Sequence, residues 1–255
     1  MKRSPGSTAA AACGAVPAAG SDDDSTAPAS AYTAARDTVA VTGGTVAASA
    51  DSSASLRVFK ALPFAAPPVV ALRWKAPQPV VAWNGIRRND SFAPACLMGN
   101  RPAGAIGAIL YQDSEPQSED CLYLNVWTAA APGAADKRPV MLLLHGGGYL
   151  LGSGAQPNYD GGGLASKGAV VVTLNYRLGA LGFLAHPELT AESPNRASGN
   201  YALQDAIAAL QWIKANAASF GGDPANVRST ANRRAPGWQA CSTLRRRPPA
   251  CSIAW

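Results

Sequence analysis

Residues 140–144, an unbroken apolar run followed at once by His145 and three glycines, constrain the fold more than any other segment. A continuous apolar run of this length is typical of a strand buried on both faces of a parallel sheet. The glycines that follow are Gly146, Gly147 and Gly148. Glycine has no Cβ, so three in a row allow the main chain itself to approach another molecule closely. We therefore expect a buried strand that ends in a loop whose backbone N–H groups face a ligand.

The remaining pattern predicts an α/β fold. We expect a hairpin at 38–48, short strands at 56–59 and 122–127, and a second buried strand at 169–174. The proline-rich stretch 63–79 should be irregular, because proline cannot donate to a sheet. The clearest helix is 199–220, which Ser198 or Asn200 would cap and Gly221 would end. Its expected buried stripe consists of Leu203, Ala206, Ile207, Leu210, Ile213 and Ala217. Strands followed by a helix in this order predict right-handed crossovers.

The net charge of +6 does not indicate a nucleic-acid-binding surface. Residues 228–255 hold six arginines and no acidic residue, whereas the 16 other basic residues are balanced by 16 acidic ones in residues 1–227. The excess therefore belongs to one tail and not to a face of a folded domain, and we expect no nucleic-acid partner. No stretch approaches 18 consecutive apolar residues, so we expect no transmembrane helix.

The first 35 residues lack the large apolar side chains that a core needs, and we expect them to be disordered. Lys2 and Arg3, followed by the short stretch 8–12 and Cys13, are similar to a degraded bacterial lipoprotein signal. An ordinary flexible N-terminus is the alternative. The chain divides into this segment (1–35), a folded part (36–227) and an arginine-rich tail (228–255) that we expect to be disordered.

The five cysteines, at positions 13, 96, 121, 241 and 251, do not have the spacing of metal ligands. Cys96 and Cys121 lie 25 residues apart and can close a loop, which would favour an oxidising compartment. Two reduced thiols are the alternative. We therefore expect no metal, and we favour a secreted, periplasmic or lipoprotein-like location.

Several motifs together resemble the type B carboxylesterases, the family that includes the cholinesterases and the bacterial para-nitrobenzyl esterases. The resemblance covers about residues 38–227. Its most specific motif is SEDCLYLNVW at 118–127, since HGGG at 145–148 also occurs in other lipase families. The other motifs are NYRLGALGF at 175–183, GNY at 199–201 and FGGDP at 220–224.

The resemblance implies the N-terminal portion of an α/β-hydrolase fold, with a mixed, largely parallel sheet and flanking helices. Gly147 and Gly148 correspond to the oxyanion-hole glycines of this family, and His145 and Gly146 would shape their loop. Cys96 and Cys121 correspond to a pair that forms a disulfide. The family needs no cofactor and acts on small-molecule esters through a serine nucleophile, a histidine base and an acid. Neither His145 nor His186 corresponds to that base, and Ser153 is expected to be a loop serine.

The sequence departs from the family after Val227. Relatives continue into a strand and then Gly-Glu-Ser-Ala-Gly, whereas this chain reads RSTANRRA at 228–235. If the first two bases of each codon are read as the last two of a shifted codon, the same stretch can encode Thr-Val-Tyr-Gly-Glu-Ser-Ala-Gly. We infer that a one-base change upstream of Arg228 removed the nucleophile and led to early termination. We also expect the strand at 140–144 to lose its neighbour and to have an open apolar edge.

The leading hypothesis is therefore a carboxylic-ester hydrolase family member whose present chain is inactive, because it holds neither nucleophile, base nor acid. The alternative is a catalytically dead binding or adhesion module of the same fold. The retained HGGG loop argues against that alternative, because a binding module does not need it.

Overall fold

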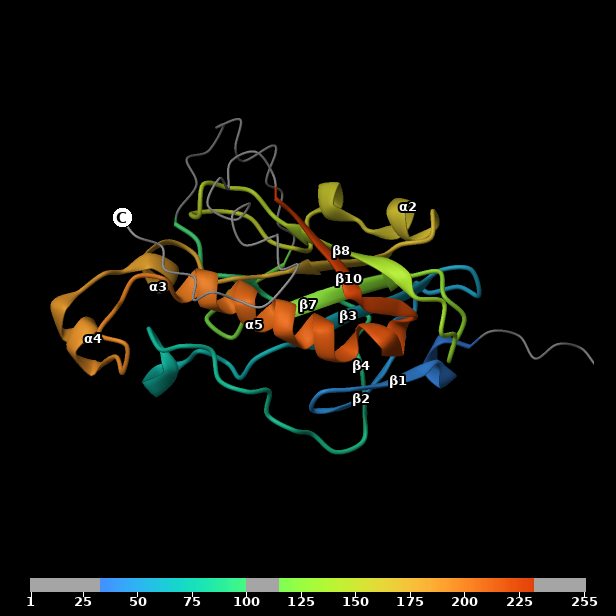
Figure 1. Cartoon of the computed structure of the whole chain (residues 1–255), viewed down its shortest axis with the longest axis horizontal. Helices are drawn as coiled ribbons and strands as arrows, with labels where there is room; N and C mark the ends of the chain where they lie inside the picture. The colour runs from blue at the N-terminus through green and yellow to red at the C-terminus, as the bar shows by residue number, and fades with distance from the viewer. Residues whose placement is uncertain (1–32, 100–114, 232–255) are drawn as a thin grey trace, which may run out of the picture. The chain divides into compact units, whose positions relative to one another are not determined.

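A computed structural model describes residues 33–99 and 115–231 of the chain (Figure 1). The predicted hairpin at 38–48 is present: strands β1 (Thr38–Val41) and β2 (Gly44–Ala47) pair antiparallel. Strand β4 (Ile86–Arg88) adds to β2 in parallel and completes a small sheet. The 3-10 helix η1 (Ala34–Arg36) precedes β1. Ala34 and Ala35, the last two residues of the segment that we expected to be disordered, therefore lie in a helical turn.

The main sheet has five strands in the order β10-β8-β9-β7-β3. Its members are β3 (Arg57–Pro63), β7 (Tyr123–Thr128), β8 (Arg138–Leu144), β9 (Val170–Leu174) and β10 (Gly222–Ala231). Strand β8 is parallel to both β9 and β10, whereas β7 is antiparallel to both β9 and β3. The predicted mixed α/β architecture is confirmed, and within the described residues this main sheet has two parallel and two antiparallel pairings.

Helices cover both faces of this sheet (Figure 1). Helix α5 (Tyr201–Asn216) packs on one face, where Leu142, Leu174 and Trp212 belong to the larger of two hydrophobic clusters. The short helix α2 (Gly162–Ala165) lies on the other face, over Trp127 and Val171. Because both faces are covered, all five residues of β9 are buried, as the apolar run predicted.

The remaining elements are short. They are η2 (Val70–Leu72), β5 (Ala95–Cys96), β6 (Gln117–Ser118), η3 (Pro157–Tyr159), α3 (Gly179–Phe183), α4 (Pro187–Glu192) and η4 (Ala217–Phe220). Across the described ranges, no helix has both the length and the apolar character needed to span a bilayer.

The predicted helix at 199–220 is confirmed as α5 followed by η4, but its buried face differs from the expected stripe. The buried residues of α5 are Tyr201, Ala202, Asp205, Ala206, Ala209, Trp212, Ile213 and Asn216. The helix is rotated so that Asp205 reaches Arg177 and Trp212 enters the core, which leaves Ile207 43% exposed. Asn200 occupies the N-cap position without a side-chain cap, and the Ser198 hydroxyl bonds to the backbone of His186 instead. Gly221, with φ +78°, ends η4 as expected.

Strand β10 continues to Ala231, four residues past the boundary that the change of sequence suggested. Arg228 pairs with Met141 and Ala231 with Leu144, so β8 has a neighbour on this side, and the expectation of an open edge there is wrong. A parallel ladder is held by backbone hydrogen bonds, and an edge strand accepts polar side chains that face solvent. The expectations for residues 1–32 and 232–255 lie outside the described part.

Candidate functional site

The loop after β8 has a backbone that only glycine adopts without strain. Gly147 has φ +134° and Gly148 has φ +63°. A Cβ added to Gly147 would lie 1.9 Å from the carbonyl oxygen of Leu151, whereas one added to Gly148 would meet open space. Position 147 therefore favours glycine because of both its positive φ and its close contact with Leu151. Position 148 favours glycine because of its positive φ alone.

Two adjacent N–H groups of this loop, those of Gly147 and Gly148, differ from the amides around them. The neighbouring amides are used: Gly146 N–H donates to the Tyr159 hydroxyl at 2.8 Å, and the N–H groups of Leu150 and Leu151 donate to the Gly147 carbonyl. Within the described residues, no hydrogen bond uses the N–H of Gly147 or of Gly148. Gly147 is half-buried and Gly148 is exposed. Two free donors side by side can hold an oxygen atom that gains negative charge.

His145 supports this loop from inside the protein. Its ring is 1% exposed and stacks on the ring of Tyr176, with centroids 4.2 Å apart and planes 10° from parallel. The Tyr176 hydroxyl donates to the His145 carbonyl at 2.7 Å, and His145 Nδ1 lies 3.1 Å from the Gly146 carbonyl. A histidine enclosed in this way orients the backbone and is not presented to a substrate.

A polar network holds the far end of the loop, and the sequence analysis did not identify it. The Gly154 N–H donates to the Asn175 side chain at 2.8 Å, and its carbonyl accepts from the Thr173 hydroxyl at 2.8 Å. Asn125 of β7 donates to the same hydroxyl at 3.0 Å. All three side chains are buried. The one signal in the sequence was the presence of polar residues within otherwise apolar strands, since buried polar groups need partners.

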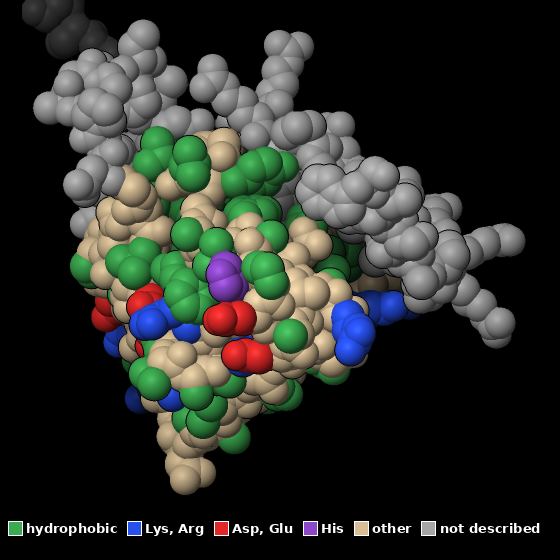
Figure 2. Space-filling model, turned by 90° about the vertical axis from the view of Figure 1, so that its left-hand side faces the viewer, with side chains coloured by type: hydrophobic (Ala, Val, Ile, Leu, Met, Phe, Trp, Pro, Cys, Tyr) green, Lys and Arg blue, Asp and Glu red, His purple; other side chains and the backbone are tan. Residues whose placement is uncertain are grey.

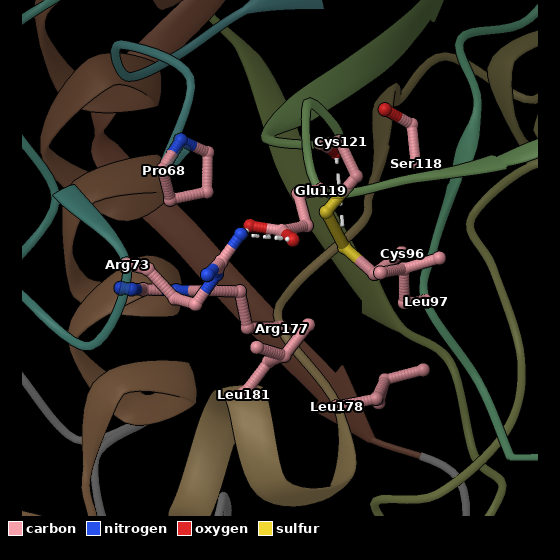
Figure 3. Close-up of a pocket in the computed structure, with 10 residues that line it drawn as sticks. All are labelled: Pro68, Arg73, Cys96, Leu97, Ser118, Glu119, Cys121, Arg177, Leu178 and Leu181. Carbon is pink, nitrogen blue, oxygen red and sulfur yellow. Dashed lines mark hydrogen bonds and ion pairs between the residues drawn. A yellow bond between two sulfur atoms is a disulfide. The ribbon is translucent and has the colours of Figure 1, made fainter. Parts of the chain in front are cut away.

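The predicted disulfide between Cys96 and Cys121 is present (Figure 3). Both cysteines are buried, and the bond lies beside the bidentate ion pair of Arg73 with Glu119. Closing a loop of 25 residues stabilises a fold by about 3 kcal/mol in the chain-entropy model. The disulfide therefore secures the SEDC motif next to the end of the sheet.

A second buried ion pair joins the NYRL motif to α5. The Arg177 guanidinium donates to both carboxylate oxygens of Asp205, at 2.8 and 2.6 Å, and also to the Lys75 carbonyl. Burial raises the pKa of the Asp205 carboxyl, and the hydrogen bonds from Arg177 oppose that rise. The pair fixes the chain that leaves β9 against the helix that covers the sheet.

His186 and Ser153 form local hydrogen bonds that stabilise the backbone around them. His186 is exposed and forms the N-cap of α4, and Figure 2 shows a histidine at the surface of the end of the molecule that carries α3 and α4. Ser153 is buried in the loop, and its hydroxyl accepts from the Ala155 N–H. In the described ranges, no group of three or more His, Cys, Asp or Glu residues is placed to bind a metal ion.

Comparison with known proteins agrees with this geometry. Residues 35–232 match the Carboxylesterase family. The chain is 50% identical over 178 residues to a fumonisin B1 esterase of Sphingopyxis macrogoltabida, covering 68% of this chain and 31% of that protein. It is 43% identical over 171 residues to a para-nitrobenzyl esterase of Bacillus subtilis, covering 66% and 33%. The chain thus spans about a third of the length of these relatives.

Solved carboxylesterase structures also resemble this chain in sequence and in fold. A para-nitrobenzyl esterase superposes with a TM-score of 0.66 at 36% identity, over 76% of this chain and 38% of that one. A carboxylesterase of Geobacillus stearothermophilus superposes with a TM-score of 0.66 at 37% identity, over 77% and 37%.

Proposed function

This chain belongs to the carboxylesterase family, and from that premise we propose that residues 36–231 form the oxyanion-stabilising part of a serine carboxylic-ester hydrolase. The observation that carries the proposal is that the N–H groups of Gly147 and Gly148 have no hydrogen-bond partner in residues 33–99 and 115–231. Their substrate would be a small-molecule ester, whose carbonyl oxygen gains negative charge when the nucleophile attacks.

The proposed role of the loop is electrostatic. Donors fixed before the reaction do not have to reorganise when the charge develops, and each contributes about 3–4 kcal/mol to transition-state stability in such sites. His145, Tyr176 and Tyr159 supply that rigidity here through the stacking and hydrogen bonds around the loop. The complete reaction needs a serine, a histidine and an acid but neither metal nor cofactor.

The register of β10 supports the position that we propose for the missing nucleophile. Ala231 is level with Leu144, the residue directly before the HGGG loop. In the shifted reading frame, positions 231–235 can encode Gly-Glu-Ser-Ala-Gly, which places a serine at 233. Parallel strands end at the same edge of a sheet, so that serine would follow β10 next to the two free N–H groups.

We propose that the 255-residue chain does not itself hydrolyse esters, because residue 233 is arginine and the chain contains no Gly-x-Ser-x-Gly elbow. The buried disulfide supports folding in an oxidising compartment.

The test is to resequence the DNA around Val227, restore the frame, extend the reading frame to its next stop, and measure hydrolysis of para-nitrophenyl acetate. The restored enzyme should turn over and be inhibited by an organophosphate, and its variant with alanine in place of the serine at 233 is the matched control. The 255-residue chain should not exceed the buffer rate. Organophosphate-sensitive turnover by that chain would contradict the proposal.

A further inference from the structure

A cavity of about 240 Å³ lies beside the Trp127 face of the main sheet. Phe92 and Trp127 form its aromatic wall, with ring centroids 6.3 Å apart. The segment that follows the glycine loop contributes residues 154–157, which include Gln156, and Glu115 and Asp160 complete the described lining. Its residues are distinct from Gly147 and Gly148, the proposed oxyanion donors.

Gln156 is the unusual residue in this wall. It is 2% exposed, and neither Nε2 nor Oε1 of its side chain has a hydrogen-bond partner in the described protein. A buried amide without partners is costly, and such groups are rare in native proteins. A primary amide presents an N–H donor and a carbonyl acceptor side by side in one plane. A single group can satisfy both atoms if it offers an acceptor and a donor with the same spacing.

The charge of the lining further restricts the ligand. Among the described residues that line the cavity, Glu115 and Asp160 are the ionisable ones, and both are acidic. An anion would meet like charge from these two carboxylates, and Lys60, whose ammonium lies 4.5 Å from the centre of the Phe92 ring, already pairs with Asp51. The aromatic wall in turn favours a flat apolar group, which packs on ring faces and edges.

We propose that this cavity binds a small, flat, uncharged molecule that carries an amide-type group, such as an aryl carboxamide, and that Gln156 pairs with this group through two hydrogen bonds. The volume is below the roughly 300–1,000 Å³ of typical drug-sized sites, which limits the ligand to about one ring and its amide. The site is independent of ester chemistry, so its test does not depend on the proposed esterase activity.

The first experiment titrates the 255-residue chain with benzamide, followed by saturation-transfer NMR of the ligand. We expect saturable binding at millimolar concentration or tighter. Benzoate has the same shape with two acceptors and a negative charge, and N,N-dimethylbenzamide lacks the N–H donor. Each should bind at least about tenfold more weakly than benzamide. Equal affinity for all three compounds, or no saturable benzamide binding, would overturn the proposal.

The second experiment compares Gln156→Leu with Gln211→Leu, an identical change at an exposed position of α5. Leucine is similar in size to glutamine and has no unsatisfied polar atoms, so the Gln156→Leu chain should fold at least as well as the parent chain. Its affinity for benzamide should fall at least about tenfold, whereas the Gln211→Leu chain should bind like the parent. Unchanged benzamide affinity in Gln156→Leu would show that the cavity holds only water or does not use this amide.

Discussion

Replacing Gly147 by alanine should destabilise the fold far more than the same change at Gly148. Both residues have positive φ, and forcing alanine into such a conformation costs about 1–2 kcal/mol. Only Gly147 has a second problem, because its new Cβ would lie 1.9 Å from the backbone oxygen of Leu151. A backbone atom cannot rotate away as a side chain can.

Relief of that contact requires the loop to open. The Gly147 carbonyl accepts hydrogen bonds from both Leu150 and Leu151, and a shift large enough to admit a methyl group would weaken them. One lost hydrogen bond of this kind costs about 1 kcal/mol. We therefore expect Gly147→Ala to lower the free energy of unfolding by about 3 kcal/mol and Gly148→Ala by about 1 kcal/mol.

Urea unfolding followed by far-UV circular dichroism measures both values in the 255-residue chain, without any need for activity. For a domain of about 200 residues, 3 kcal/mol corresponds to a fall in Tm of roughly 6–12 °C. In the frame-restored enzyme, Gly147→Ala should also lower kcat at least about a hundredfold, since it displaces a proposed oxyanion donor. Equal destabilisation by the two substitutions would refute the steric part of this reasoning.

Two further predictions concern ionisable groups, one buried (Asp205) and one half-buried (Tyr123). Asp205→Asn should lower the free energy of unfolding by about 3–5 kcal/mol in urea, because it leaves the Arg177 charge buried without its carboxylate; a change below 1 kcal/mol would contradict this. Burial, together with the hydrogen bond to Asp120 and the charge of that residue, raises the pKa of Tyr123 from 10.0 to about 12, so the neutral phenol is favoured by folding. Its contribution to stability is then present below pH 10 and is lost as the pH rises towards 12, and Tyr123→Phe should reduce the loss of stability over that window in melts between pH 9 and 12.

The apolar strands and the long helix could be predicted because burial leaves a periodic trace in the sequence. Residues 140–144 and 169–174 became β8 and β9, since strands in the middle of a covered sheet are rich in apolar side chains; all five residues of β9 are buried, whereas Met141 and Leu143 of β8 are only partly buried. The glycine loop could be predicted for a similar reason, because positive φ and close contact both demand glycine. Burial along a strand and a positive φ at a glycine depend on a residue's own backbone and immediate surroundings, and so they can be inferred from the local sequence.

The side-chain partnerships could not be predicted, because they depend on which elements become neighbours. Asn125, Thr173 and Asn175 form one network around Gly154 only after β7, β9 and the loop come together. The rotation of α5 was missed for the same reason: the ion pair of Asp205 with Arg177 outweighs the simple apolar stripe. Ile207, although apolar, is left at the surface as a result.

The altered sequence begins in β10, at positions where most side chains are exposed and contribute little to the stability of the fold. In β10, Arg228 and Thr230 are exposed and Ser229 is half-buried, while the backbone pairs with β8 throughout 227–231. We expect Arg228→Thr, one of the residues allowed by the shifted frame, to change the free energy of unfolding by less than about 0.5 kcal/mol, as for other surface substitutions.

Ser229→Val, also allowed by the shifted frame, places a β-branched side chain at a half-buried strand position opposite Leu142. It should raise the free energy of unfolding by about 1 kcal/mol in the same urea titration. If Arg228→Thr and Ser229→Val shift the urea midpoint equally, the register of β10 described here is wrong. If they differ as expected, β10 stays paired with β8 despite the change of sequence after Val227. The change then removes the proposed nucleophile, and its effect on catalysis is larger than its effect on the stability of the fold.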